Sequence, residues 1–398
     1  MADTPDTFAA APSALGYFYQ PRFALYYLLQ LDETAHVLIE KDDDLDFKET
    51  DGKLTLASLK HKKEGETLTD LATDYWKSVR VSLASYKIHK SSANLRFFLF
   101  TTATATGPFS KLFVPDAKPP EDGKTLAQKA KDMMAGSKAE IVDHVKKSLE
   151  DLSDAEKEDF FSRIKIFDSS PRVEDLPALI KNNYMRTVKT NARNAVFQRL
   201  EGWWGNEILL LLTKQRVDPI IGQEVSDMLC SIADEYKADN LPITFGESQP
   251  DHIDVAGDNR LFVAQLREIG ISSERIHHAI IDYYRAFEQR SAWARESLLV
   301  SGEIERYERR LTEEWQRYSA IVFDSIPSGA PEEALKQKGD ELYKWAQMQC
   351  MHLKIRPRVD EAFVVRGNFQ ILANVNPPGV YWHPQFLAKL DAILGSSK

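Results

Sequence analysis

The side chains best suited to chemistry lie within residues 35–62, where a group of acids is followed by a lysine. Glu40, Asp44 and Asp46 come after a short apolar segment, and Lys60 ends the next one. Neighbouring antiparallel strands would bring acids at the end of one strand beside a lysine at the end of the next. Carboxylates that hold a divalent metal ion neutralise a phosphate and generate hydroxide, while a lysine stabilises the charge of the transition state. The pattern therefore predicts a metal-dependent nuclease.

The acidic run has two other interpretations. Consecutive acids such as 42–44 commonly form a solvated turn, and the cluster alone leaves that interpretation open. A calcium-binding loop is a second candidate, because aspartates alternate from Asp42 to Asp46. It fails in detail, since Phe47 stands where such a loop needs glycine and Lys53 where it needs a bidentate glutamate.

Gln20 precedes the acids on a predicted helix. Its amide could bind a metal-bound water or a phosphate, or it could fix the helix to the sheet, and both interpretations stay open. Lys60 has a simpler alternative as a surface lysine, because it begins the basic run 60–63. Its place at a strand end beside acids favours the catalytic interpretation.

Basic residues are concentrated where acids are missing. No acid occurs between Asp74 and Asp116, or between Asp175 and Glu201, although the whole chain has a net charge of −9. Such segments are plausible contacts for a phosphate backbone, and the alternative is chance together with pairing to acids elsewhere. The predicted nucleic-acid contacts are Lys62, Lys77, Arg80, Lys87 and Lys90.

Composition limits the remaining possibilities. A chain of 398 residues predicts two domains, and 43% apolar with 28% charged residues is typical of a soluble globular protein. The longest apolar run, 208–212, is far too short for a membrane span. Two cysteines exclude a disulfide framework, and the acidic N-terminus does not look like a secretory signal, so we expect a cytoplasmic protein without membrane contact.

The elements that must position these residues follow from periodicity. Apolar residues at helical spacing predict a helix over 17–31, alternation predicts strands at 36–40 and 54–60, and the nearly continuous apolar run 95–102 predicts a strand buried on both faces. Helices are predicted at 67–79, 124–135, 137–150, 154–163, 174–183 and 187–215, with a strand at 164–167.

The C-terminal part has a different pattern. Residues 239–259 show no period and contain two Pro and two Gly, so they predict a linker. Helices are expected from 272, continuing past Gly302 to about Trp315, and over 331–353. Alternation around Gly367-Asn368 predicts a hairpin of 362–365 and 369–373. We therefore expect a nuclease domain over 1–245 and a mainly helical interaction domain over 246–398.

The order of helix, strand, acids, strand and lysine resembles the PD-(D/E)xK restriction-endonuclease superfamily, whose core is a helix followed by strands bearing an acid and an (E/Q)-x-K tripeptide. Gly16-Tyr17-x-Tyr19-Gln20 and Ser58-Leu59-Lys60-His61 look like the effector nuclease domain of bacterial anti-phage systems of the cyclic-oligonucleotide and Lamassu types. Three C-terminal motifs look like the tail domain of the LmuA-type effector and of ABC-ATPase three-component systems: Phe262-Val263-x-Gln265-Leu266, Gln289-Arg290-Ser291-x-Trp293 and Trp382-His383-Pro384.

This resemblance implies an α/β fold, a restriction-endonuclease-like mixed sheet flanked by helices, followed by the mainly α-helical domain. It implies an Mg²⁺ cofactor, with Mn²⁺ able to substitute. Glu40 and either Asp44 or Asp46 would bind the metal, and Lys60 would stabilise the phosphorane. Ser58 departs from the family's Glu or Gln, so with Gln20 it could only support the site, and loss of catalysis is a possible consequence.

The resemblance also implies partners. Double-stranded DNA is the expected substrate, and an SMC-like ABC ATPase with a small accessory subunit would hold the nuclease inactive. Activation would change the assembly, and the active form would be a homo-oligomer, since one metal site cuts one strand. Two alternatives remain: a catalytically silent DNA-binding scaffold of the same complex, and a nuclease that acts on RNA or single strands.

Overall fold

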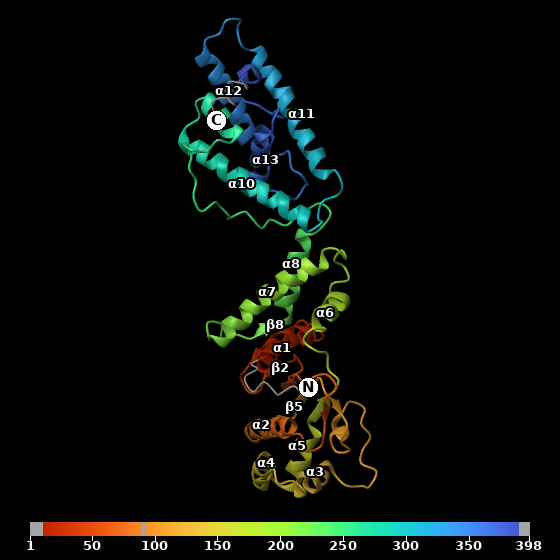
Figure 1. Ribbon diagram of the computed structural model, residues 1–398. Helices are drawn as coiled ribbons and strands as arrows, with labels where there is room; N and C mark the ends of the chain where they lie inside the picture. The colour runs from red at the N-terminus through yellow and green to blue at the C-terminus, as the bar shows by residue number, and fades with distance from the viewer. Residues whose placement is uncertain (1–10, 90–91, 390–398) are drawn as a thin grey trace, which may run out of the picture. The chain divides into compact units, whose positions relative to one another are not determined.

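The computed structural model describes residues 11–89 and 92–389 (Figure 1). The chain divides into two compact units, and each is described by itself. The first contains the described residues of 1–188 and 193–232, and the second those of 189–192 and 233–398. The boundary expected after residue 245 falls within the second unit. None of the helices in the described ranges combines the length and apolarity that a bilayer span requires.

A six-stranded mixed sheet forms the centre of the first unit, in the order β7-β5-β3-β2-β1-β8. β1, β2 and β3 form an antiparallel meander, β5 and β7 continue it in parallel with β3, and β8 pairs antiparallel with β1. The strands are β1 His36–Ile39, β2 Leu45–Lys48, β3 Leu54–Lys60, β5 Leu95–Thr101, β7 Ile164–Phe167 and β8 Ile220–Ile221. A separate parallel pair joins β4 Thr67–Leu68 to β6 Thr104–Ala105.

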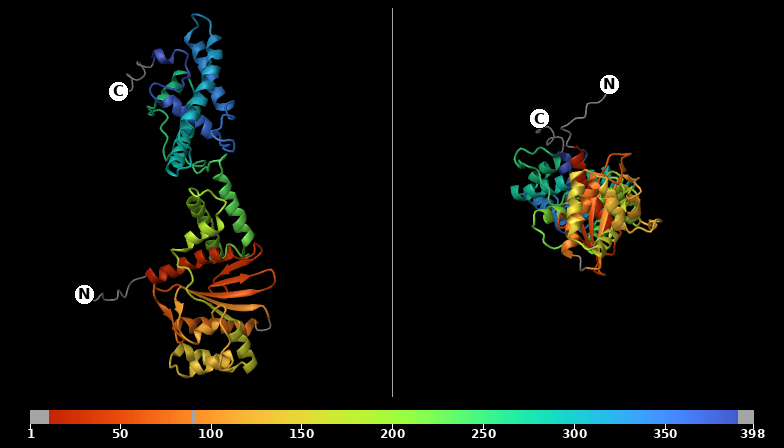
Figure 2. Two further views of the ribbon diagram at one scale, coloured as in Figure 1. Left: turned by 90° about the vertical axis from the view of Figure 1, so that its right-hand side faces the viewer. Right: turned by 90° about the horizontal axis from the view of Figure 1, so that it is seen from below.

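Helices cover both faces of this sheet (Figure 2). On one face α1, Ala11–Leu28, places Phe23 against Phe100 of β5, with ring centroids 4.7 Å apart. On the other face Trp76 of α2, Thr73–His89, belongs to a buried cluster with Phe97 and Leu99 of the same strand. Because successive strand residues point to opposite faces, coverage of both faces explains why β5 is mainly apolar, with the exception of the exposed Arg96 and of Thr101 at its end.

Further helices of the first unit pack against the sheet, against its covering helices and against one another. They are η1 Ser110–Phe113, α3 Leu126–Ala135, α4 Glu140–Glu150, α5 Asp154–Ser162, α6 Leu176–Tyr184, α7 Arg193–Leu212 and α8 Gly222–Glu235, which continues to the division between the units. Thr125 and Ser153 cap α3 and α5 through reciprocal hydrogen bonds with Gln128 and Glu156, which is why both helices begin where they do.

The second unit is helical in its described residues and is built around α13, Ala362–Asn374. Around it lie α9 Leu261–Glu268, α10 Ser273–Arg295, α11 Glu303–Asp324 and α12 Glu332–Met348. Most residues of α13 are buried, the polar Asn368 and Gln370 among them, as expected for a central helix. Gly367 lets α10 approach closely, because a Cβ there would lie 2.1 Å from the carbonyl oxygen of Asp282.

Two sequence predictions are wrong in this unit. The expected hairpin of 362–365 and 369–373 is the single helix α13, in which the polar residues Arg366, Gln370 and Asn374 recur at the helical spacing of four. The expected continuous helix through Gly302 is two helices, α10 ending at Arg295 and α11 beginning at Glu303. Gly302 has φ 70°, a left-handed conformation that ends helical geometry.

Candidate functional site

The acidic segment forms a turn between β1 and β2. Glu40 ends β1 with φ 53°, an uncommon backbone conformation for a residue other than glycine. Its backbone N–H donates to the carbonyl oxygen of Asp44 at 3.1 Å, which closes the turn, while its side chain is exposed. The turn therefore returns the chain directly into β2, a strand that the sequence analysis did not identify.

Asp46 organises this turn from within β2. Its carboxylate accepts hydrogen bonds from the backbone N–H groups of Asp42 and Asp43, each at 3.2 Å. The residue is 5% exposed, and burial together with the charge of Asp42 raises its pKa to about 7. The observed role of Asp46 is thus to hold the acidic turn in shape.

Asp44 is the residue on which the elements converge. Gln20 of α1 donates its Nε2–H to Oδ1 of Asp44 at 3.1 Å. On β3, the N–H of Leu59 donates to Oδ2 at 2.7 Å, and Nζ of Lys60 lies 3.4 Å from the same oxygen. Of the two aspartates left open by the sequence, Asp44 is the one that the structure brings against Lys60.

Asp43 is a residue of this site that the sequence analysis did not include. The hydroxyl of Ser58 lies 2.9 Å from each of its carboxylate oxygens and donates to them. Burial raises the pKa of Asp43 to about 6, and the charge of Asp44 adds to that rise, while Ser58 and Lys60 oppose it. The sequence signal was present, since a carboxylate missing at position 58 coincides with a surplus of acids in the preceding turn.

A cavity of about 260 Å³ opens beside this constellation. Its lining comes from α1 and the end of β3: Gly16, Tyr17, Tyr19, Gln20, Asp44, Leu59, Lys60 and His61. Glu40 and Asp46 are not part of that lining. The structure thus gathers Gln20, Asp44 and Lys60 at one opening, with Ser58 behind them on the same strand.

His61 faces this cavity but is tied to the protein. Its Nε2 accepts a hydrogen bond from the backbone N–H of Val173 at 3.4 Å, and its ring packs against Tyr19 with centroids 5.0 Å apart. Burial and the nearby Arg172 guanidinium lower the pKa of His61, so the imidazole is neutral at pH 7. A neutral ring of this kind offers little to a phosphate.

The predicted phosphate contacts differ in how they are paired. Lys62 forms an ion pair with Asp74, and Lys87 lies 2.7 Å from Asp151. Lys77 and Arg80 are exposed on α2 and lie one turn apart. Lys90 lies outside the described residues. For Lys62 and Lys87, pairing with acids is therefore a simpler explanation than contact with a phosphate backbone.

The donor set of this site suits a hard divalent cation. Asp43 and Asp44 are adjacent carboxylates, and carboxylate oxygens are the ligands that Mg²⁺ and Mn²⁺ prefer. The raised pKa of Asp43 shows that nearby cationic groups do not fully compensate its charge. The residues present therefore fit the ion that the sequence predicts.

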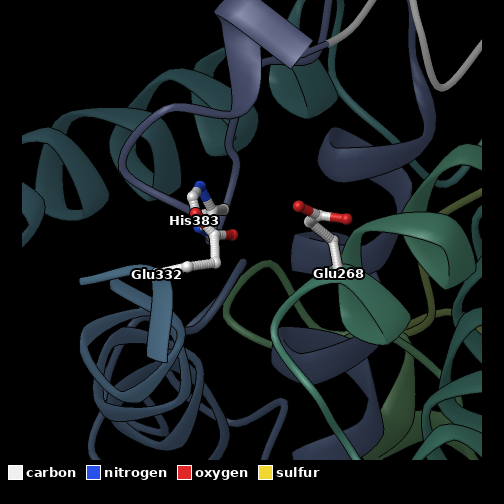
Figure 3. A group of neighbouring side chains, drawn as sticks. All are labelled: Glu268, Glu332 and His383. Atoms are coloured by element: carbon white, nitrogen blue, oxygen red, sulfur yellow. The ribbon is translucent and has the colours of Figure 1, made fainter. Parts of the chain in front are cut away.

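A second acidic cluster lies in the C-terminal unit, where Glu268, Glu332 and His383 place one ligand atom each within 4.8 Å of the others (Figure 3). The Lys389 ammonium lies 2.6 Å from both carboxylates and compensates part of their charge. Nδ1 of His383 accepts the N–H of Gln385 at 3.1 Å, so the hydrogen of the neutral ring is on Nε2, which faces Glu332 at 3.2 Å. A metal would need a lone pair on that nitrogen, which the hydrogen occupies. The cluster is therefore a group of ion pairs and not a metal site.

Comparison with known proteins links the C-terminal unit to one family. Residues 262–390 match the family described as C-terminal domain 7 of the ABC-three component (ABC-3C) systems. This match supports an anti-phage defence setting for the chain. No curated protein matches the sequence.

Among solved structures, the chain is similar to the Acinetobacter baumannii Cap4 SAVED/CARF-domain containing receptor. The structure with the cyclic trinucleotide 2'3'3'-cAAA matches at 14% identity over 55% of this chain and 45% of that one, with a TM-score of 0.33. The structure of the receptor alone matches at 15% identity over 55% and 47%, with a TM-score of 0.32. The chain thus spans less than half of those structures, and the similarity is too low to define a shared fold.

Proposed function

We propose that this chain is a metal-dependent DNA endonuclease that serves as the effector of an anti-phage defence complex. The observation that carries the proposal is the convergence of Gln20, Asp44 and Lys60 at one cavity. These residues come from a helix, a turn and a strand that are distant in sequence, which a solvated acidic turn does not require.

The chemistry assigned to each residue follows from its contacts. Asp44 would hold the cation, and Gln20 and the N–H of Leu59 orient its carboxylate. Lys60, poised 3.4 Å from Asp44, would stabilise the charge that develops on the phosphate oxygens. A bound Mg²⁺ supplies neutralisation of the phosphate and a nucleophilic hydroxide at neutral pH.

The arrangement of the first unit supports the same proposal. A helix that carries Gln20 precedes a strand, the acids and a second strand with Lys60, the order expected for the PD-(D/E)xK core. A mixed sheet with helices on both faces is compatible with a restriction-endonuclease-like fold. Exposed Lys77 and Arg80 would contact the phosphate backbone, with an affinity that falls as salt rises.

The family match of the second unit supports a partner of ATPase type. We propose that an SMC-like ATPase and an accessory subunit restrain the nuclease, and that activation produces a homo-oligomer with several active sites. Restraint of this kind is needed because a nuclease without base-reading residues would also cut the host chromosome.

A substrate panel tests the proposal. The purified full chain is incubated in Mg²⁺ with supercoiled plasmid, linear duplex, single-stranded DNA and RNA, and each reaction is repeated in EDTA. We expect nicking and linearisation of duplex DNA only in Mg²⁺. Cleavage confined to RNA or single strands would mean that the substrate is one of these and not duplex DNA. Duplex binding that persists in EDTA, without cleavage by any oligomer in Mg²⁺, would support a silent scaffold instead.

A further inference from the structure

Ser58 occupies the first position of the tripeptide that ends at Lys60, where the PD-(D/E)xK pattern has Glu or Gln. Ser58 precedes Lys60 by two residues on β3, so both side chains point to the same face of the sheet. A serine there is short and 3% exposed, and it supplies no charge. A longer acidic side chain at this position would extend its carboxylate beyond the hydroxyl of Ser58, toward the acidic turn.

A carboxylate already lies at that place. Both oxygens of Asp43 are 2.9 Å from the Ser58 hydroxyl, so the carboxylate of the turn sits directly over position 58. Asp44, the next residue, directs its own carboxylate to Lys60. The two adjacent acids therefore flank the strand that bears the lysine.

The turn holds Asp43 in this position. The carboxylate of Asp46 accepts the N–H groups of Asp42 and Asp43, and the N–H of Asp44 donates to Oδ1 of Asp43 at 2.9 Å. Shaping the turn is thus mainly the work of Asp46, which accepts two backbone hydrogen bonds. Asp43 accepts only one from within the turn, and its other described hydrogen bonds come from Ser58 on the neighbouring strand.

We propose that Asp43 is the second cation-binding carboxylate of the site, held by Ser58 in the place that an acidic residue at position 58 would otherwise occupy. This inference rests on the proposed nuclease function. It assigns a role to the substitution at position 58, since a hydroxyl there anchors the displaced carboxylate. It also gives the two aspartates different roles: Asp43 binds the cation, and Asp46 shapes the turn.

The experiment measures cation binding apart from cleavage. Ca²⁺ and Mn²⁺ are titrated by calorimetry into the full chain, into Asp43→Asn and Asp43→Ser, and into Asp43→Ser/Ser58→Glu, which moves the carboxylate to β3. Plasmid cleavage in Mg²⁺ is measured in parallel. Circular dichroism and thermal melting establish that each variant is folded.

Removing the Asp43 carboxylate should weaken cation binding at least about tenfold, the lower range for substitutions around metal sites. The relocated glutamate should recover most of that loss, a result that a purely structural aspartate would not give. Asp43 variants that bind cations and cleave like the wild type would overturn the inference while leaving the nuclease intact. If the Asp43 variants do not fold, a folded double variant that binds no cation also overturns it. A wild-type chain that neither binds cations nor cleaves would instead remove the proposed function.

Discussion

Two groups of acids, one in each unit, differ in how their charge is compensated. In the C-terminal unit, Arg356 clasps Glu303 through two hydrogen bonds of 2.8 Å, and the pKa of Glu303 is held below its usual range. In the acidic turn of the first unit, Asp43 is half-buried and Asp46 is buried, and their pKa values are raised to about 6 and about 7. Both arrangements place carboxylates out of water, but only one provides each with a matched cation.

The difference indicates what each arrangement is for. A buried acid with its own guanidinium is a structural contact, and even the Glu268 and Glu332 pair receives Lys389. Burial of carboxylates without full compensation is unfavourable for folding. Perturbed pKa values concentrate at functional sites, where a fold retains groups that do not favour its stability.

The largest effect is expected at Asp44. Asp44→Asn keeps the shape of the side chain but removes the charge that faces Lys60 and the cation. We expect plasmid cleavage in Mg²⁺ to fall at least about 100-fold, as is typical when a group that stabilises the transition state is lost. The matched control is Asp51→Asn, an exposed acid of the neighbouring turn paired with Lys53. Equal activity of both variants would mean that Asp44 has no catalytic role.

In the C-terminal unit the largest effect is on stability. Arg356→Met leaves Glu303 buried and also removes the hydrogen bonds to the carbonyl oxygens of Asn240 and Leu298. We expect a loss of about 3 kcal/mol in the free energy of unfolding, typical of a broken buried ion pair. Chemical denaturation measures it, with the surface residue Lys338→Met as control, which should cost less than about 0.5 kcal/mol. A cost for Arg356→Met as small as that of the control would contradict the structural role of the pair.

The sequence predicts the features that depend on neighbouring residues better than those that depend on contacts between distant segments. Strands at 36–39, 54–60 and 95–101 follow from alternation and burial, and the parallel pairing of β3 with β5 agrees with the apolar run of β5. β2 alternates apolar and charged residues, but it is only four residues long and continues directly from the acidic run that was interpreted as a turn. The choice of Asp44 over Asp46 could not be predicted, since it depends on the left-handed backbone of Glu40 and on the contact with Gln20.

The C-terminal unit shows a different limit. Val364, Val365 and Ile371 favour a strand locally, but with α10 packed closely at Gly367 the segment forms a mostly buried helix. The partners of buried acids, such as Arg356 for Glu303, are separated by more than 50 residues and leave no local pattern. Tertiary contacts override local preference in both cases.

The uncompensated acids also predict a pH dependence. The pKa of Asp46 is higher in the folded state than in the unfolded chain, so the folded state holds the proton more tightly. Stability from this group is therefore greatest in acid and is lost as pH rises from about 4 to about 7. In EDTA, we expect wild type to lose about 2 kcal/mol relative to Asp46→Asn between about pH 5.5 and about pH 8. If the free energies of unfolding of wild type and Asp46→Asn changed by the same amount with pH, the charge of Asp46 would be compensated in the folded state.

The smallest effect is expected at the second acidic cluster. Lys389→Met removes the ammonium from Glu268 and Glu332, and partial exposure limits the cost to about 1 kcal/mol. Because Nε2 of His383 carries the hydrogen, neither Mn²⁺ nor Zn²⁺ should raise the melting temperature of the wild type or the variant. A cation-dependent rise in either would make this cluster a metal site and end the contrast between the units.

We propose that Asp44 and Lys60 of the first unit cut DNA together with a bound cation. The most direct test of this proposal is plasmid cleavage in Mg²⁺ by wild type, Lys60→Ala and Lys62→Ala, two lysines on the same segment of which only the first faces Asp44. The account predicts Mg²⁺-dependent nicking that is lost in Lys60→Ala and in EDTA but retained in Lys62→Ala. Cleavage that survives in folded Lys60→Ala would contradict it.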